Sequence, residues 1–239
     1  MKAATRMARR IYIRLPASWR YILKAAMARW QIARGSFRGA EPEWERLAEW
    51  LGPGDWAIDV GAHMGVYTAR MSELVGPSGR VIAFEPTLES FSLLTRNARH
   101  FAHPNVTLLS LAVSDTSAEV GFDVPPWGDG TPNYYQAHIS AIGPFRVLAM
   151  PIDSLSLAGP VRVVKIDVEG HEAAVLRGMW DLLKRDRPVI VFEKQAEACR
   201  LLESLGYQVA DDGTSPNFVA VHLESTSPRR EADRYARVV

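Results

Sequence analysis

The chain has 239 residues, of which 47% are hydrophobic and 23% charged, so we expect one folded domain with short extensions rather than a disordered protein. The single cysteine, Cys199, excludes an internal disulfide and a cysteine-based zinc site. No apolar run approaches the ~18 residues of a membrane span, so we expect no such span. Arg14 interrupts the only early apolar stretch, so we expect no secretory signal. Both features lead us to expect a cytoplasmic protein.

The net charge of +1 conceals an uneven distribution of charge along the chain. Residues 1–38 contain ten Lys or Arg and no Asp or Glu, whereas the remainder has the other 18 basic residues against all 27 acidic ones. A basic extension therefore precedes an acidic body. Because nucleic-acid binding requires a basic surface near the site, we expect no nucleic-acid partner.

The segment from Pro16 to Ala33 has the spacing of an amphipathic helix. Its apolar face comprises Trp19, Ile22, Leu23, Ala26, Trp30 and Ala33. Such a helix fits peripheral contact with the inner membrane surface, a targeting peptide, or packing across the domain or a partner subunit, and all three interpretations stay open. We expect a basic helical extension over residues 1–40, one domain over 41–224 and a mobile polar tail over 225–239.

The segment 56–65 (WAIDVGAHMG) predicts a buried strand, a glycine turn and the start of a helix. The next strand, 80–85, ends in Glu85. A glycine-rich first turn and an acid at the tip of the second strand are typical of sites for ribose-bearing cofactors. Gly61 and Gly65 give G-x-x-x-G rather than the dinucleotide pattern, and Asp59 would repel a pyrophosphate but attract the cationic S-adenosyl-L-methionine.

Strands and helices alternate along most of the remaining chain, which predicts a Rossmann-like α/β fold with a mostly parallel seven-stranded sheet and helices on both faces. Further strands are expected at 105–113, 161–167, 188–193, 206–210 and 217–222, and helices at 41–51, 64–75, 87–101, 171–184 and 195–205.

Acidic residues follow five of the predicted strands: Asp59, Glu85, Asp115, Asp167 and Glu193. Ligands of open α/β sheets bind beyond the carboxyl ends of the strands, so we expect these side chains around one crevice. We assign Glu85 to a ribose diol, Ser114 or Asp115 to an adenine amine, and Asp59 with the loop from Gly61 through His63 to Gly65 to the methionine end.

The segment 164–172 (VKIDVEGHE) supplies the candidate catalytic residues Asp167, Glu169 and His171. A hydroxyl acceptor needs a base that removes its proton. A histidine such as His171 titrates near neutral pH, and nearby acids are expected to raise the pKa of His171. Glu169 is the competing candidate for the base. Asp167 with Glu193 could ligate a divalent cation such as Mg²⁺. Simple charge complementarity to a helix N-terminus is the alternative explanation for Glu169 and Glu172.

The irregular segment from Val120 to Pro144 interrupts the alternation. We interpret it as a lid over a small-molecule or glycan acceptor, with Trp127, Tyr134, Tyr135 and His138 available to contact a sugar; a plain surface loop fits equally well.

Taken together, these segments resemble the FkbM-type S-adenosylmethionine-dependent methyltransferases. The similarity runs from about residue 55 to 221 and includes DVGAHMG (59–65), AFEP (83–86), AVSD (112–115), KIDVEGHE (165–172), VLRG (175–178) and PVIVFE (188–193). The family commonly has Asn where His63 stands, so the cofactor contact of this position departs from the family pattern. It often has a small residue where His171 stands, which favours Glu169 over His171 as the base.

The resemblance implies a class I methyltransferase fold and O-methylation of a hydroxyl on a sugar, glycolipid or natural product. It also implies cofactor roles for Asp59, Gly61, Gly65, Glu85 and Asp115. The alternatives left by the residues are a nicotinamide-dependent oxidoreductase on a similar sheet and a non-catalytic cofactor-binding adaptor.

Overall fold

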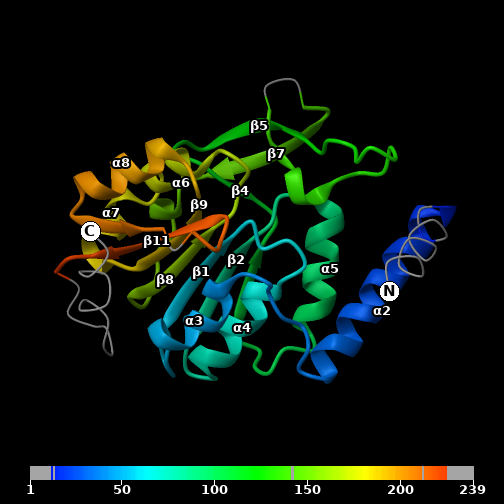
Figure 1. Ribbon diagram of the computed structural model, residues 1–239, viewed down its shortest axis with the longest axis horizontal. Coiled ribbons are helices and arrows are strands. Elements are labelled where there is room, and N and C mark those ends of the chain that lie inside the picture. The colour runs from blue at the N-terminus through cyan, green and yellow to red at the C-terminus, as the bar shows by residue number, and fades with distance from the viewer. Residues whose placement is uncertain (1–11, 13, 141–142, 212, 225–239) are drawn as a thin grey trace.

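A computed structural model describes residues 12, 14–140, 143–211 and 213–224 (Figure 1). The polar tail 225–239, for which mobility was expected, and the first eleven residues lie outside the described residues. Within the described part of the chain, no helix is both long and apolar enough to cross a bilayer.

Seven strands form the large sheet, in the order β10-β11-β9-β8-β1-β2-β3. Five neighbouring strands pair in parallel, and β11 is antiparallel to both β9 and β10. Their bounds are β1 Trp56–Val60, β2 Arg80–Phe84, β3 Val106–Leu109, β8 Val161–Ile166, β9 Val189–Glu193, β10 Tyr207–Ala210 and β11 Asn217–His222. The predicted mostly parallel, seven-stranded sheet is confirmed.

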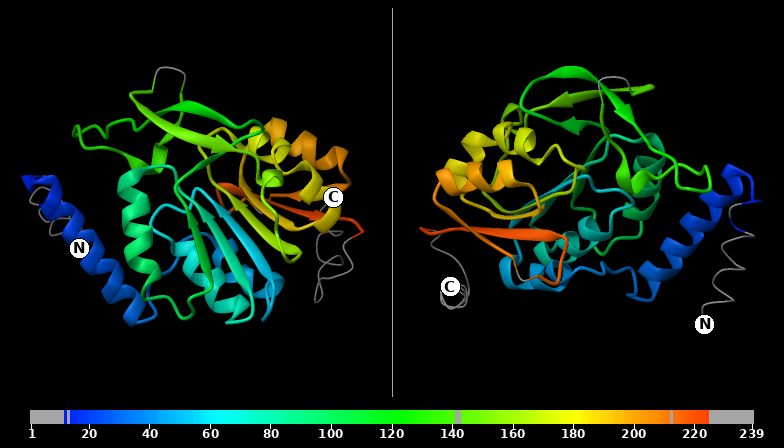
Figure 2. Two further views of the ribbon diagram at one scale, coloured as in Figure 1. Left: turned by 180° about the vertical axis from the view of Figure 1, so that it is seen from behind. Right: turned by 45° about the horizontal axis from the view of Figure 1, so that its top comes forward.

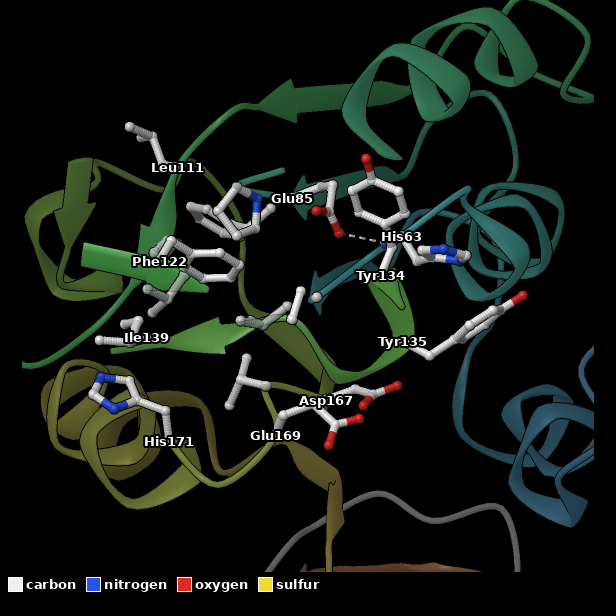
Figure 3. A pocket seen from close by; sticks show the side chains of 18 residues that line it. His63, Glu85, Leu111, Phe122, Tyr134, Tyr135, Ile139, Asp167, Glu169 and His171 are labelled. Carbon is white, nitrogen blue, oxygen red and sulfur yellow. Dashed lines mark hydrogen bonds between the residues drawn. The ribbon is translucent and has the colours of Figure 1, made fainter. Parts of the chain in front are cut away.

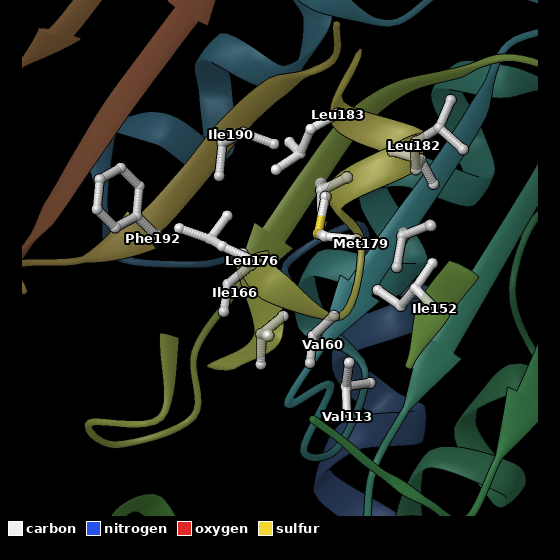
Figure 4. Packing of buried hydrophobic residues seen from close by; sticks show 14 of the residues in the cluster. Val60, Val113, Ile152, Ile166, Leu176, Met179, Leu182, Leu183, Ile190 and Phe192 are labelled. Atoms are coloured by element: carbon white, nitrogen blue, oxygen red, sulfur yellow. The ribbon is translucent and has the colours of Figure 1, made fainter. Parts of the chain in front are cut away.

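Helices cover both faces of this sheet, because its central strands are apolar on both sides. One face carries α3 (Pro42–Trp50), α4 (Val66–Val75) and α5 (Leu88–Ala98). The other carries α6 (Glu172–Arg177), α7 (Trp180–Asp186) and α8 (Ala196–Ser204). Figure 4 shows the main core, where side chains of β1, β8 and β9 such as Val60, Ile166 and Phe192 pack under Leu176 and Met179.

Two predicted elements are each divided in the structure. The expected helix 171–184 is broken into α6 and α7 at Gly178, where a Cβ atom would collide with the Ser114 carbonyl oxygen. The expected strand 105–113 is broken into β3, which belongs to the large sheet, and β4 (Ala112–Val113), which does not. Both predictions of a continuous element were wrong, because contacts between distant segments decide these breaks.

A second sheet, in the order β4-β7-β5-β6, lies over the carboxyl ends of the large sheet (Figures 1 and 2). It contains β5 (Ala118–Asp123), β6 (His138–Ile139) and β7 (Phe145–Met150), with short 3₁₀ turns η1 (Tyr134–Gln136) and η2 (Ile152–Ser154) nearby. The segment that interrupts the α/β alternation therefore has its own structure. It closes one side of the region where the strand tips gather.

The predicted N-terminal helix is present as α2 (Ala17–Ala33) and lies along α5 at the edge of the molecule (Figure 1). Its contact with the domain uses the small buried residues Ala25 and Ala28. The Tyr21 hydroxyl lies 2.6 Å from the Ser92 hydroxyl in the same contact. The broad apolar face that the sequence predicts points away from the domain instead.

Candidate functional site

A cavity opens where the carboxyl ends of β1, β2 and β8 meet the small sheet (Figure 3). Its wall includes six of the predicted cofactor-binding and catalytic residues: Gly61, His63, Glu85, Asp167, Glu169 and His171. The remaining wall is largely apolar and aromatic, with contributions from Val60, Phe84, Leu111, Val113, Phe122, Tyr134, Tyr135 and Ile139.

The loop between β1 and α4 requires glycine for packing as well as for conformation. Gly61, Gly65 and also His63 have positive φ angles of 79°, 91° and 48°, a region that residues with a Cβ seldom adopt. A Cβ atom on Gly61 would collide with the carbonyl oxygen of Asp167, and one on Gly65 would lie 2.6 Å from Leu94. Gly61 thus lets the tips of β1 and β8 approach each other.

Glu85 is a buried carboxylate held rigidly at the cavity wall. Its Oε2 accepts the backbone N–H of His63 at 2.8 Å, and its Oε1 accepts the backbone N–H and hydroxyl of Thr87 at 2.8 and 2.6 Å. Burial raises the pKa of this carboxyl, and the hydrogen bonds from Thr87 and His63 oppose the increase. Three donors occupy three of about four acceptor positions of a carboxylate. Capacity remains on Oε2 for a ligand hydroxyl.

Asp59 lies fully buried behind the cavity wall rather than on it. Its Oδ2 accepts the Thr68 hydroxyl at 2.5 Å, and its Oδ1 has no hydrogen-bond partner among the described residues. Burial raises the pKa of Asp59, and the nearby Lys165 ammonium opposes that increase. The contact of Asp59 with the methionine end of a cofactor stays a prediction, and Oδ1 is the atom that has acceptor capacity for it.

Lys165 is a buried cation that the sequence-based selection of site residues missed. Its ammonium lies 2.6 Å from Asp167 Oδ2 and 4.8 Å from the centre of the Tyr67 ring. The neighbouring carboxylates Asp167 and Asp59 raise its pKa against the opposing effect of burial. A lysine in the middle of an apolar strand was the available signal, since such a strand buries both faces.

Three carboxylates crowd together at the tips of β8 and β9. Asp167, Glu169 and Glu193 each have a ligand atom within 4.8 Å of the others. Burial, followed by the charge of Asp167, raises the pKa of Glu193 to about 7 and also raises the pKa of Glu169. A carboxylate with a raised pKa is a stronger base at neutral pH. The backbone of Glu169, with φ 54°, places its side chain on the cavity wall.

His171 lies on the cavity wall but also contacts Ser114, the residue directly after β4. Its Nε2 is 3.0 Å from the Ser114 hydroxyl. Burial lowers the pKa of His171, and the nearby Asp115 carboxylate does not compensate. The predicted increase in this pKa was wrong, because desolvation outweighs the one close acid.

Asp115 and Ser114 do not line the cavity. Asp115 Oδ2 accepts a hydrogen bond from Arg177 Nε at 3.1 Å, which is the main reason that its pKa is lowered. Arg177 also binds Glu197 at 2.8 Å. Of the five strand-tip acids, Glu85 and Asp167 line the cavity, whereas Asp115 is exposed and paired with Arg177 of α6; a cofactor role for Asp115 stays a prediction.

The segment predicted to be a lid contributes two tyrosines to the cavity wall, Tyr134 and Tyr135. The ring of Tyr135 packs against that of His63, with centroids 4.4 Å apart. Trp127 and His138 are not on this wall; the His138 ring instead makes a 2.9 Å hydrogen bond with the Gln136 carbonyl oxygen.

Comparison with known proteins identifies the family. Residues 59–209 match the methyltransferase FkbM domain. The chain belongs to this family. It is 31% identical over 176 residues to the hexuronic acid methyltransferase AglP of Haloferax volcanii, covering 72% of this chain and 69% of that protein. A protein-L-isoaspartate O-methyltransferase of Triticum aestivum is 34% identical over 103 residues, covering 42% of this chain and 41% of that protein.

A solved FkbM methyltransferase from Methylobacillus flagellatus has a similar fold, with a TM-score of 0.53 at 17% identity. The similarity covers 76% of this chain and half the length of that protein. This FkbM-domain protein is thus an S-adenosylmethionine-dependent methyltransferase of class I fold. The nicotinamide-dependent alternative has no support among these matches.

The residues of the FkbM-domain cavity fit such a cofactor. Glu85 offers an acceptor of the kind that a ribose diol requires, and the apolar wall offers a surface for an adenine ring. Acidic side chains outnumber basic ones around the cavity, with Asp167 and Glu169 on its wall and the buried Asp59 behind it. That balance suits a cationic sulfonium and would disfavour a pyrophosphate.

Proposed function

We propose that this methyltransferase transfers a methyl group to a hydroxyl of a sugar, either free or as part of a glycolipid or natural product. One observation carries the proposal: a carboxylate with a raised pKa, Glu169, shares the cavity wall with Glu85 and with the aromatic rings of Tyr134 and Tyr135. Aromatic rings beside a few polar groups suit a sugar face and its hydroxyls. The similarity to a hexuronic acid methyltransferase supports the same acceptor class.

The cofactor would be held mainly by the β1 and β2 ends of the cavity. We assign the ribose hydroxyls to Glu85 and the methionine end to the Gly61–Gly65 loop, which includes His63. Because Ser114 and Asp115 are engaged elsewhere, we assign the adenine to the apolar wall of Leu111, Val113 and Phe122. S-Adenosylmethionine supplies an electrophilic methyl group at this site.

Glu169 would accept the proton of the acceptor hydroxyl. Its raised pKa places the carboxylate closer to neutral pH, where a general base is most effective. Asp167 would be held in place by its 2.6 Å contact with Lys165 and would help to orient the acceptor. His171 is the weaker candidate for the base, because the Ser114 hydroxyl already holds its Nε2 and burial lowers its pKa.

The proposal is tested with labelled methyl donor and uronic acid glycosides or a cell-envelope glycan extract as acceptor. Glu169→Gln is expected to lower turnover by about 10²- to 10⁴-fold, as loss of a general base does. Binding of S-adenosylhomocysteine, measured by calorimetry, is expected to stay within about twofold. Glu203→Gln, at an exposed position on α8, is the matched control. Undiminished turnover of Glu169→Gln would remove Glu169 as the base.

A divalent cation such as Mg²⁺ forms a second part of the proposal. The close spacing of Asp167, Glu169 and Glu193, and the pKa of Glu193 of about 7, support it, because crowded carboxylates gain from a cation between them. Lys165 already neutralises part of this charge through Asp167. Removal of metal with EDTA distinguishes the two cases: a loss of turnover that Mg²⁺ restores supports the cation, and unchanged turnover assigns neutralisation to Lys165 alone.

A further inference from the structure

The helix α2 turns a stripe of large apolar side chains away from the domain. The α2 stripe consists of Trp19, Ile22, Leu23, Met27 and Trp30, each at least 44% exposed. On the opposite side of the helix, the small residues Ala25 and Ala28 pack against the domain. Figures 1 and 2 show α2 as the outermost element on its side of the molecule, beyond α5. A contiguous exposed surface of this kind marks an interaction site.

The segment of the chain that carries the stripe is basic. Residues 1–38 contain ten Lys or Arg and no acidic residue, whereas the rest of the chain has an excess of acidic residues. Arg29 on α2 and Arg34 directly after it are exposed, and the Arg34 guanidinium lies 4.7 Å from the centre of the Trp30 ring. Tryptophan and arginine on one amphipathic helix match the boundary between acyl chains and headgroups of a bilayer.

We propose that α2 docks on an anionic lipid surface, with the α2 stripe inserted among the acyl chains and the exposed Arg29 and Arg34 at the headgroups. A second copy of this chain is the less favourable occupant. A two-fold contact between the stripes would bring two acid-free, basic segments together, and like charges in one interface repel. An anionic bilayer instead neutralises them, at about 1 kcal/mol per basic residue near the surface.

The opposite side of α2 connects this surface to the active site. Arg20 and Lys24 line a second cavity together with Tyr134, Tyr135 and His63, and the last three also line the active-site cavity. Docking of α2 would therefore bring this second cavity, which adjoins the active-site cavity, close to the lipid headgroups. A lipid-linked acceptor fits this placement; that consequence rests on the proposed function, whereas binding of α2 to lipid does not.

Co-sedimentation of the full chain with vesicles tests the docking without any measurement of methyl transfer. We expect binding to phosphatidylcholine vesicles that contain about one-third phosphatidylglycerol, and weaker binding to phosphatidylcholine alone or in about 0.5 M NaCl. The double variant Trp19→Ser/Trp30→Ser should lower the partition into anionic vesicles about tenfold or more. Circular dichroism checks that the variant is folded.

The matched control is Leu148→Ser/Leu223→Ser, which removes two apolar side chains that are 61% and 72% exposed but lie away from α2. This control should sediment as the unmodified chain does. Equal sedimentation of Trp19→Ser/Trp30→Ser and the unmodified chain would overturn the proposal. So would a dimer, detected by light scattering, that the tryptophan variant dissociates while neither protein binds vesicles. Failure of methyl transfer with intact vesicle binding would count against the proposed function alone.

Discussion

Replacement of the buried Lys165 by methionine should destabilise the protein far more than replacement of Lys194, a more exposed lysine, by methionine. The Lys165–Asp167 and Lys194–Asp211 pairs have the same N···O distance, 2.6 Å. The Lys165 side chain is 6% exposed, whereas that of Lys194 is 33% exposed. Methionine occupies a similar volume, so the two substitutions differ mainly in what happens to the charges left behind.

The magnitude follows from the partners of Lys165. Loss of one member of a fully buried pair costs about 3–5 kcal/mol. Asp167 is 40% exposed and water can solvate it, which reduces this cost. Asp59 is completely buried, and the Lys165 ammonium is the nearby cation that opposes the increase in its pKa. We therefore expect Lys165→Met to lower the free energy of unfolding by about 2–4 kcal/mol, and Lys194→Met by about 0–1 kcal/mol.

The effect should also depend on pH in a defined direction. Burial raises the pKa of Asp59 in the folded state, and removal of the Lys165 charge would raise it further. Above the pKa of an unfolded Asp, the folded state then binds more protons than the unfolded state, so stability falls as pH rises. The deficit of Lys165→Met should thus be smaller at about pH 5.5 than at about pH 8.

Urea denaturation followed by tryptophan fluorescence, at both pH values, measures these free energies. Equal deficits for Lys165→Met and Lys194→Met would refute the argument that Lys165 neutralises a buried acid. A deficit of Lys165→Met that grows on acidification would contradict the assigned direction of the Asp59 pKa.

Three further predictions concern the strand tips and the break between α6 and α7. Gly178→Ala should lower the free energy of unfolding by at least about 2 kcal/mol, because the new Cβ would collide with the Ser114 carbonyl oxygen. The control is Gly128→Ala, whose Cβ meets no described atom within 4 Å. This control should change the free energy of unfolding by less than about 0.5 kcal/mol in the same denaturation assay. Glu85→Gln should weaken S-adenosylhomocysteine binding about 10- to 100-fold in calorimetry, the loss expected for charged hydrogen bonds; unaltered affinity would separate Glu85 from the ribose. The pKa of Glu193 is raised to about 7, so ionisation of Glu193 opposes folding as the pH rises above the ordinary glutamate pKa. Glu193→Gln should therefore stabilise the protein by about 1 kcal/mol at about pH 8 and not at about pH 4, a modest figure that allows for partial solvent exposure. A stabilisation that is the same at both pH values would show that the charge is not its cause.

The sequence by itself determined the order of strands and helices, the glycine turn after β1 and the acids at the strand ends. These features are local: apolar periodicity identifies an element, and a glycine or acid at its end is visible in the chain. The presence of Glu85, Asp167 and Glu169 on one cavity wall follows from such local signals, because the ends of parallel strands meet at one edge of a sheet.

Only the tertiary structure decided which of these side chains face the cavity. Asp59 and Asp115 occupy similar places in the sequence pattern, yet one is buried next to Thr68 and the other is drawn out by Arg177. The same holds for α2. The spacing of its apolar residues predicts an apolar face but carries no information about what covers that face. Contacts between residues distant in sequence decide both outcomes, and a periodic pattern along the chain does not encode them.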